Sequence, residues 1–579
     1  MTDTDAEAGS PLIPCPSRQP LNVEGVRAYA SDPFWKRVRT VILLSLFALW
    51  VSLLAVAAVG AARKPCGNYM RARRSAGVDG LVYRVEAGAF CCGDSGKGDL
   101  RGLITKLNYL VELGVNIVWL SSVHKSPNKN FGLGVEDFQT VDPDLGTLEI
   151  FKELVSEMKK RDLKLVIDLV PNHTSSKHIW FQKSIDRIDP YTNYYIWEPP
   201  YKFDGEGNPI PPNNWVSRTG GSAWEYNEKR KEFYLHQFSK GQADLNFHNE
   251  KVLEEMLNIF TFWLDLGVAG FSLDAAPHLH EVLPLRDELL IGSNHHLETI
   301  NDSQNSINHI NTNELPENLK LLQALRNYVE DYSKKSDGIP RILMTGIHDT
   351  VKYAAKYNSN GSKPLVDLLY NFPLITRINS SSSANDVMSA ISMWINNIPH
   401  GIKANWVIGN YGQKRIADRL GSNMVDGMNM IALLLPGTVI TYYGEDIGYH
   451  SDATKFPDSK NYPSKILKTQ EIGDGHLNVY KQLSKAREEP AIKFGNLETK
   501  VLNGSVFAFT RYEPGFPQYL VAVNWSEEKV QVDFGVFDVS ERARVYVQSS
   551  ESPRRDPDVK DIHAVVMEPN EGMVLVFEP

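Results

Sequence analysis

The chain has 579 residues, of which 42% are hydrophobic, 23% charged and 10% aromatic, and its formal net charge is −9. This length exceeds one typical domain, so two or more folded units are expected, and the ordinary composition excludes disorder throughout. The chain has no basic stripe and no zinc-type Cys/His spacing, which argues against a nucleic-acid-binding protein.

The N-terminal part predicts a tail, a membrane anchor and a neck. Residues 1–40 carry acids, Pro, Ser and Gly with little periodicity, which is typical of a flexible cytosolic tail. Residues 41–62 form 22 residues without a charge, and about 20 apolar residues suffice to cross a bilayer. The segment starts too late and is too long for a signal peptide, so a single transmembrane helix is predicted. Residues 63–80 follow as a basic extracellular neck.

The orientation of this anchor is not decided by its flanks, because basic residues stand on both sides in similar number. An odd number of cysteines after the anchor suggests one intermolecular disulfide or one free thiol in an oxidising compartment; these are Cys66, Cys91 and Cys92. Five glycosylation-type triplets also favour an extracellular C-terminal part: Asn301, Asn360, Asn379, Asn503 and Asn524. We therefore expect a type II, single-pass glycoprotein of the plasma membrane.

The remaining chain predicts an α/β domain and a β domain. Between residues 81 and 488, near-continuous apolar strands alternate with amphipathic helices, a pattern typical of a parallel sheet covered on both faces. Its length favours a (β/α)8 TIM barrel, with a Pro-, Asn- and Trp-rich lid subdomain inserted at about 176–248. Residues 489–579 alternate in short strands and predict a C-terminal antiparallel β-sandwich domain.

Several motifs in the same order resemble the α-amylase superfamily, and in particular its α-glucosidases. They are "GDLRGLITKLNYLVELGVNIVWLSSV", "VIDLVPNHTS", "GFSLDAAPH" and "LLLPGTVITYYGEDIG". The resemblance implies a barrel whose catalytic carboxylates lie at the carboxyl ends of strands, where one attacks the anomeric carbon and another protonates the leaving oxygen.

Position by position, the resemblance implies a degenerate catalytic set. Asp274 matches the nucleophile, and His173 in "PNHTS" is kept, but Ser272 replaces the arginine two residues before the nucleophile. Gly346 in "ILMTGI" replaces the glutamate that donates the proton, and Gly412 in "GNYG" replaces the third acid. General acid catalysis contributes about 10²–10⁴-fold, so this resemblance implies no catalytic residue and no enzyme activity.

The calcium-type loop of these relatives is also altered. Here it reads "CCGDSGKGD", with Asp94 and Asp99 as the remaining carboxylates, so no cofactor is expected and calcium has weak support.

A degenerate α-amylase-like domain behind one anchor, with a cysteine beside the membrane, also resembles the heavy-chain subunits of heteromeric amino-acid transporters. That resemblance implies a disulfide from Cys66 to a multi-span light chain, whose stability and delivery to the cell surface the heavy chain supports. We therefore expect a non-catalytic subunit for amino-acid transport. The alternative is a membrane-anchored α-glucosidase with an unconventional active site.

Overall fold

The computed structural model describes residues 32–62, 78, 80–90, 98–127, 134–289, 308–346, 350–359, 363–398, 403–450, 475–553, 558–559 and 561–578. The chain divides into two compact units, Met1–Ser75 and Ala76–Pro579. Cys66, Cys91, Cys92, Asp94, Asn301 and Asn360 lie outside the described residues.

In the first unit, the described residues form one helix, α2 (Pro33–Ala62). Asp32 begins it, because its carboxylate accepts a hydrogen bond from the backbone N–H of Phe34 at 2.7 Å, and proline is favoured at the first helical position. Across the parts of the chain that the structure describes, no helix is both long and apolar enough to cross a membrane. The predicted span at 41–62 is therefore not supported.

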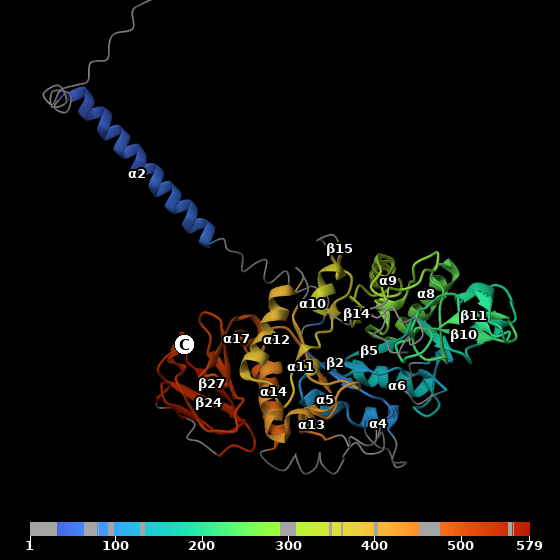
Figure 1. Ribbon diagram of the computed structural model, residues 1–579. Helices are drawn as coiled ribbons and strands as arrows, with labels where there is room; N and C mark the ends of the chain where they lie inside the picture. Colours follow the sequence, from blue (N-terminus) through green and yellow to red (C-terminus); the bar gives the residue numbers. More distant parts are fainter. Residues whose placement is uncertain are drawn as a thin grey trace, which may run out of the picture. The chain divides into compact units, whose positions relative to one another are not determined.

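The second unit contains the predicted barrel, which the structure confirms as a nearly closed sheet of eight parallel strands (Figure 1). Their order in the sheet is β17-β14-β13-β5-β2-β1-β19-β18. The strands are β1 (Leu81–Val85), β2 (Val115–Leu120), β5 (Lys164–Leu169), β13 (Gly270–Leu273), β14 (Ile342–Thr345), β17 (Leu368–Leu369), β18 (Asn405–Val407) and β19 (Thr438–Tyr442).

The seam of the barrel lies between β17 and β18, which are the two ends of the sheet order. Asn405 closes it with its side chain: Oδ1 accepts from the backbone N–H of Asn371 at 2.9 Å, and Nδ2 donates to the carbonyl of Leu369 at 2.6 Å. The Asn371 amide returns a third bond to the Asn405 carbonyl at 3.2 Å. Both asparagines are buried, so these bonds satisfy polar groups that would otherwise be costly to desolvate.

Helices cover the outside of the barrel because each presents an apolar stripe. In α6, Thr147 caps the first turn, and Phe151, Leu154 and Met158 are buried at helical spacing. After β1, two short helices, α4 and α5, meet at Lys106. The helices of this layer include α4 (Leu100–Thr105), α5 (Leu107–Glu112), α6 (Leu148–Lys159), α8 (Glu250–Asp265), α9 (Pro316–Lys335), α12 (Ala384–Asn397), α14 (Val425–Leu434) and α16 (His476–Ala486).

Alternate strand residues point into the barrel, because side chains of a strand alternate between its two faces. One apolar cluster fills this interior: Val82, Ile117, Trp119, Val166, Ile342, Met344, Tyr370, Val407 and Ile440 are among its members. Ser272 pairs in register with Asp168 on one side and with Met344 on the other. Two residues further along, Asp274 and Gly346 therefore continue the same inward row past the carboxyl ends of adjacent strands.

The segment inserted at about 176–248 has its own small core. Its sheet consists of β7 (Trp197–Glu198), β10 (Trp224–Asn227) and β11 (Glu232–Leu235), and a second pair joins β6 (His173–Ser175) to β12 (Gln242–Asp244). Trp215 and Trp224 stack with ring centroids 5.9 Å apart. Large aromatic side chains explain how so few strands bury enough apolar area to hold a stable shape.

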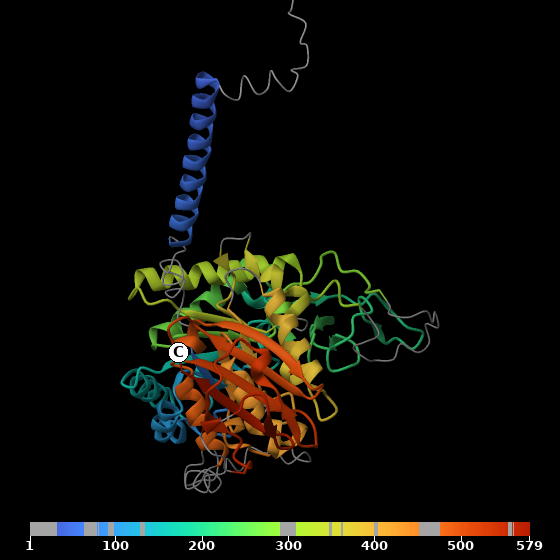
Figure 2. The same ribbon diagram turned by 90° about the vertical axis from the view of Figure 1, so that its left-hand side faces the viewer.

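The C-terminal part contains a sheet of β20 (Asn496–Leu502), β21 (Val506–Tyr512), β22 (Gln518–Asn524), β27 (Gly572–Phe577), β24 (Ala543–Gln548) and β25 (Asp558–Val559), and the pair β23 (Val530–Val532) and β26 (Val565–Met567). The paired strands are antiparallel (Figure 2). One apolar cluster contains residues of both sheets, among them Val506, Leu575, Val532 and Met567.

Candidate active site

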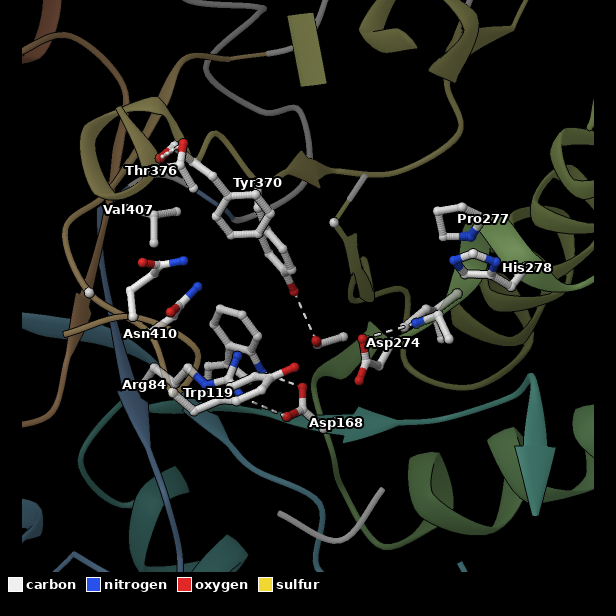
Figure 3. Close-up of a pocket in the computed structure, with 18 of the residues that line it drawn as sticks. Arg84, Trp119, Asp168, Asp274, Pro277, His278, Tyr370, Thr376, Val407 and Asn410 are labelled. Carbon is white, nitrogen blue, oxygen red and sulfur yellow. Dashed lines mark hydrogen bonds and ion pairs between the residues drawn. The ribbon is translucent and has the colours of Figure 1, made fainter. Parts of the chain in front are cut away.

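A cavity of about 730 Å³ opens at the carboxyl ends of the barrel strands. Figure 3 shows Asp274, Pro277 and His278 on one side of it and Val407 and Asn410 on the other. Carboxyl strand ends are where barrels of this kind place their chemistry, because the loops there vary while the strands hold their positions.

The floor of the cavity is a charged cluster from three adjacent strands. The Arg84 guanidinium bonds the carboxylates of Asp168 and Glu86, each at 3.2 Å, and Trp119 Nε1 donates to the other oxygen of Asp168 at 2.6 Å. Burial alone would lower the pKa of Arg84, but Asp168 and then Glu86 raise it above its ordinary value. The guanidinium therefore stays charged, and it lies 4.2 Å from the centre of the Trp119 ring.

Ser272 stands on this floor where the family has an arginine. Its Oγ accepts a hydrogen bond of 2.8 Å from the Tyr370 hydroxyl, and Tyr370 stacks on Trp119 with ring centroids 4.7 Å apart. The Arg84 cation and the Tyr370 ring both contact Trp119, and the smaller serine leaves room for the tyrosine hydroxyl.

A side chain at position 346 would meet neighbouring rings, which gives a steric reason for the glycine there. A Cβ at this position would lie 2.9 Å from Cδ2 of Tyr370 and 3.3 Å from Cζ of Phe372, closer than ordinary contact. The two rings therefore occupy the space into which a side chain at 346 would project. The described residues place no carboxylate on this strand end in place of the family's proton donor.

Asp274 borders the cavity, at the end of β13. Burial raises its pKa, the nearby Asp168 carboxylate raises it further, and a 2.9 Å hydrogen bond from the backbone N–H of Ala275 and the charge of Arg84 oppose the rise. The pKa of the neighbouring Tyr411 is also raised, and the main cause is the charge of the Asp274 carboxylate. Asp274 is thus a buried carboxylate at the cavity whose pKa is shifted by burial and by a neighbouring charge.

His278 is held by Gln237: His278 Nδ1 lies 3.0 Å from Gln237 Oε1, and Gln237 Nε2 donates to the His278 carbonyl at 2.8 Å. Burial, and next the charge of Arg218, lower the pKa of His278 well below its ordinary value. The imidazole is therefore neutral, and its Nε2 accepts from Arg218 Nη1 at 3.3 Å. This pairing links the inserted segment to the loop after β13.

Two further predicted site residues, His173 and Gly412, do not themselves line the cavity. His173 is buried in β6, contacts Gln242 at 2.9 Å and packs on Phe238, which itself lines the cavity, so it supports the wall. Gly412 is exposed and its backbone N–H donates to Asn410 Oδ1 at 2.9 Å, while its neighbour Tyr411 lines the cavity.

Of the two weak calcium candidates, the structure describes Asp99 and not Asp94. Asp99 Oδ1 accepts the backbone N–H of Gly102 at 2.7 Å and caps α4, so one of its oxygens is already used by the fold. Nowhere in the described ranges do three His, Cys, Asp or Glu side chains gather as a metal site.

Three of the expected glycosylation sites can be placed. Asn379 and Asn503 are exposed. Asn524 is fully buried, and its Nδ2 donates to the carbonyls of Glu528 at 2.8 Å and Glu568 at 2.9 Å. A glycan on that nitrogen would require both bonds to break, so glycosylation at Asn524 does not fit the folded chain.

Fold and cavity together define an α/β-barrel protein with a carboxylate-bearing pocket at the catalytic face of the barrel. Residues 89–477 match the family described as the α-amylase catalytic domain. The chain belongs to this family.

Individual relatives give the same picture. Maltase 1 of Drosophila virilis is 34% identical over 546 residues, which cover 86% of this chain and 86% of the maltase. The amino acid transporter heavy chain SLC3A1 of Homo sapiens is 37% identical over 417 residues, covering 72% of this chain and 58% of that protein. A solved α-glucosyl transfer enzyme, XgtA, has a TM-score of 0.71 and 26% identity, covering 86% of this chain and 99% of that one.

These similarities correct the functional expectation. Relatives that match most of the chain are named maltases and α-glucosidases, whereas the heavy-chain match covers a smaller share of both proteins. The prediction of a non-catalytic transporter subunit is therefore wrong on this comparison, as is the expectation that the chain is no enzyme. Its alternative, an α-glucosidase with an unconventional active site, is better supported.

Four residues of the site are not among the residues predicted from the sequence, and two of them, Arg84 and Asp168, carry a signal that could have indicated them. Arg84 and Asp168 stand inside the apolar runs "LVYRV" and "KLVIDL", and a charge in the middle of a buried strand indicates a pairing inside the barrel. Trp119 is marked only by its place on the next strand, and Tyr370 follows a strand of two residues that has no detectable pattern.

Proposed function

We propose that the chain is a retaining α-glucosyl-processing enzyme in which Asp274 attacks the anomeric carbon. The observation that carries the proposal is the position of Asp274, at the inward end of β13 and bordering the cavity. The names of the relatives, maltase and α-glucosidase, supply the substrate class.

Each side chain of the cavity has a role in this proposal. Asp274 forms the bond to the sugar in its ionised form. Burial and the Asp168 carboxylate raise the pKa of Asp274, and the backbone N–H of Ala275 and the charge of Arg84 favour the ionised form against that rise. Asn410 and Tyr411 are placed to bind sugar hydroxyls, and Phe238 offers an apolar face. The neutral His278 offers the sugar no charge that would compete with Asp274.

Gly346 limits which bonds can be broken. Without a carboxyl group at that strand end, the leaving oxygen gains no proton from the usual position, a contribution of about 10²–10⁴-fold. Donors whose leaving group departs without protonation avoid this loss. We therefore expect kcat/KM for maltose to lie about 10²–10⁴-fold below that for α-glucosyl fluoride.

The test uses the full chain and 5-fluoro-α-glucosyl fluoride, a probe that traps a glycosyl ester on a retaining nucleophile. Mass spectrometry of peptides should find the added sugar on Asp274, and α-glucosyl fluoride should release fluoride at a measurable rate. Asp274→Asn should lose both signals, while Asp331→Asn, an exposed carboxylate of α9, should keep them. No fluoride release and no labelled peptide in the unaltered chain would refute the proposal.

A further inference from the structure

Two arginines line the cavity without a carboxylate to neutralise them. Arg218 comes from the inserted segment, and Arg377 caps the carboxyl end of α11 (Pro373–Thr376). Among the described residues, neither forms an ion pair with Asp or Glu. By contrast, Arg84 in the same cavity is paired with two carboxylates.

Arg218 is fixed in the wall of the cavity. Its Nη1 donates to Nε2 of His278, which is neutral and so brings no compensating charge. Burial lowers the pKa of Arg218, and no nearby carboxylate raises it again. A partly buried, unpaired cation of this kind is costly unless a ligand supplies the opposite charge.

Arg377 lines the same cavity as Gly346, where the family's proton donor is lost. Phe372 precedes the first residue of α11, and its ring is the one that a Cβ at Gly346 would meet at 3.3 Å. Arg377 ends the same short helix, and among the described residues its Nη1 contacts a weak acceptor, Sδ of Met393 at 3.2 Å. The cation is exposed, so it can move toward a ligand in the cavity.

Neither arginine serves Asp274. The charges that shift the pKa of Asp274 are those of Asp168 and Arg84, and Arg218 and Arg377 do not contribute. The two cations nevertheless border the same cavity as Asp274. A sugar bound with its anomeric carbon at Asp274 has its leaving group directed away from that carboxylate.

We propose that the donor of this site is an α-glucosyl phosphate, whose phosphate leaving group is bound by Arg218 and Arg377 in place of protonation. This inference rests on the proposed function and names its donor class. Arginine suits the role because its planar guanidinium bonds phosphate oxygens in pairs and stays charged.

The step balances without a proton donor. A carboxylate oxygen of Asp274 forms a bond to the anomeric carbon of glucosyl hydrogenphosphate, and the bond from that carbon to the phosphate oxygen breaks with its electron pair on oxygen. Hydrogenphosphate dianion leaves. Water then forms a bond to the anomeric carbon, the ester electrons return to Asp274, and the proton of water passes to the released phosphate. The products are glucose and dihydrogenphosphate.

The experiment compares two donors on the full chain, α-D-glucose 1-phosphate and α-glucosyl fluoride. Release of phosphate and of fluoride gives kcat/KM for each, and the measured quantity is the ratio of the phosphate donor to the fluoride donor. We expect Arg218→Gln and Arg377→Gln each to lower this ratio about 10²-fold, as for loss of one charged donor to a developing anion. Arg218→Lys should restore part of the loss, and Arg542→Gln, an exposed arginine of the C-terminal part, should leave the ratio unchanged.

The outcomes separate this inference from the proposed function. Fluoride release with labelled Asp274, but no phosphate release from glucose 1-phosphate, would overturn the donor class and leave the nucleophile intact. An unchanged ratio in both glutamine variants would also overturn it. Loss of fluoride release and labelling in the unaltered chain would instead refute the function on which the inference rests.

Discussion

The tightest contact of the site predicts that the family's glutamate cannot simply be restored at Gly346. In Gly346→Glu, the new Cβ would begin 2.9 Å from Tyr370 Cδ2 and 3.3 Å from Phe372 Cζ. Tyr370 has little freedom to move aside, because it is stacked on Trp119 at 4.7 Å and bonded to Ser272 at 2.8 Å. We expect the variant to be destabilised and to gain no activity on maltose.

The size of the effect follows from these contacts. Overpacking a tight interior costs about 1–3 kcal/mol, and loss of the Tyr370–Ser272 hydrogen bond costs about 0.5–1.5 kcal/mol. Together they lower the free energy of unfolding by about 2–4 kcal/mol. In a Tyr370→Ala background the ring is gone, so the same glutamate should cost less, with a coupling between the two changes of about 1–3 kcal/mol.

Urea unfolding of four proteins measures this coupling: the unaltered chain, each single variant and the double variant. The double variant should also hydrolyse maltose faster than the unaltered chain, because the carboxyl group then has room at the strand end. Gly205→Glu is the control, since a Cβ there meets nothing within 4 Å. If the two changes are additive within about 0.5 kcal/mol, the ring does not occupy the space of the proton donor and the reasoning fails.

Two further predictions concern the frame around the site. Asn405→Ala removes the side-chain bonds of the barrel seam and leaves buried partners unsatisfied, so the free energy of unfolding should fall by about 2–4 kcal/mol. The control Asn397→Ala loses one exposed hydrogen bond and should change the free energy of unfolding little. Equal urea midpoints for the two variants would contradict the role of Asn405 in the seam. Burial raises the pKa of Glu314 from 4.5 to about 7, so the folded chain binds the proton more tightly than the unfolded chain. Its contribution to stability should therefore fall as pH rises from 4.5 to about 7, by at most about 3 kcal/mol, and then stay constant. Glu314→Gln should remove this fall, and an unchanged pH profile of the urea midpoint would show that another group causes it.

Much of the barrel could be predicted because its strands are apolar runs between amphipathic helices. "KLVIDL" and "GFSL" are strands as expected, and the motif order placed Asp274 and Gly346 at adjacent strand ends. The seam could not be predicted, since β17 has two residues and its partner is reached through side chains of Asn371 and Asn405. Bonds between side chains far apart in the sequence leave no periodic signal.

The functional interpretation failed for a related reason. Taken together, the losses at Ser272, Gly346 and Gly412 indicate a protein without activity, whereas the structure shows Ser272, Gly346 and Tyr370 fitting one another. Tyr370 and Ser272, which share a hydrogen bond, are 98 positions apart in the sequence. A local motif cannot indicate that a neighbouring ring has taken the place of a lost side chain.

The cluster of Arg84, Trp119 and Asp168 also has a consequence for assembly of the sheet. Its three members come from β1, β2 and β5, which are consecutive in the sheet. A shift of β5 by one residue would turn Asp168 toward the helix layer and leave a buried charge unpaired, and breaking such a pair costs about 3–5 kcal/mol. A misaligned sheet is thereby penalised, so the same charges that form the floor of the cavity also favour the native register of these three strands.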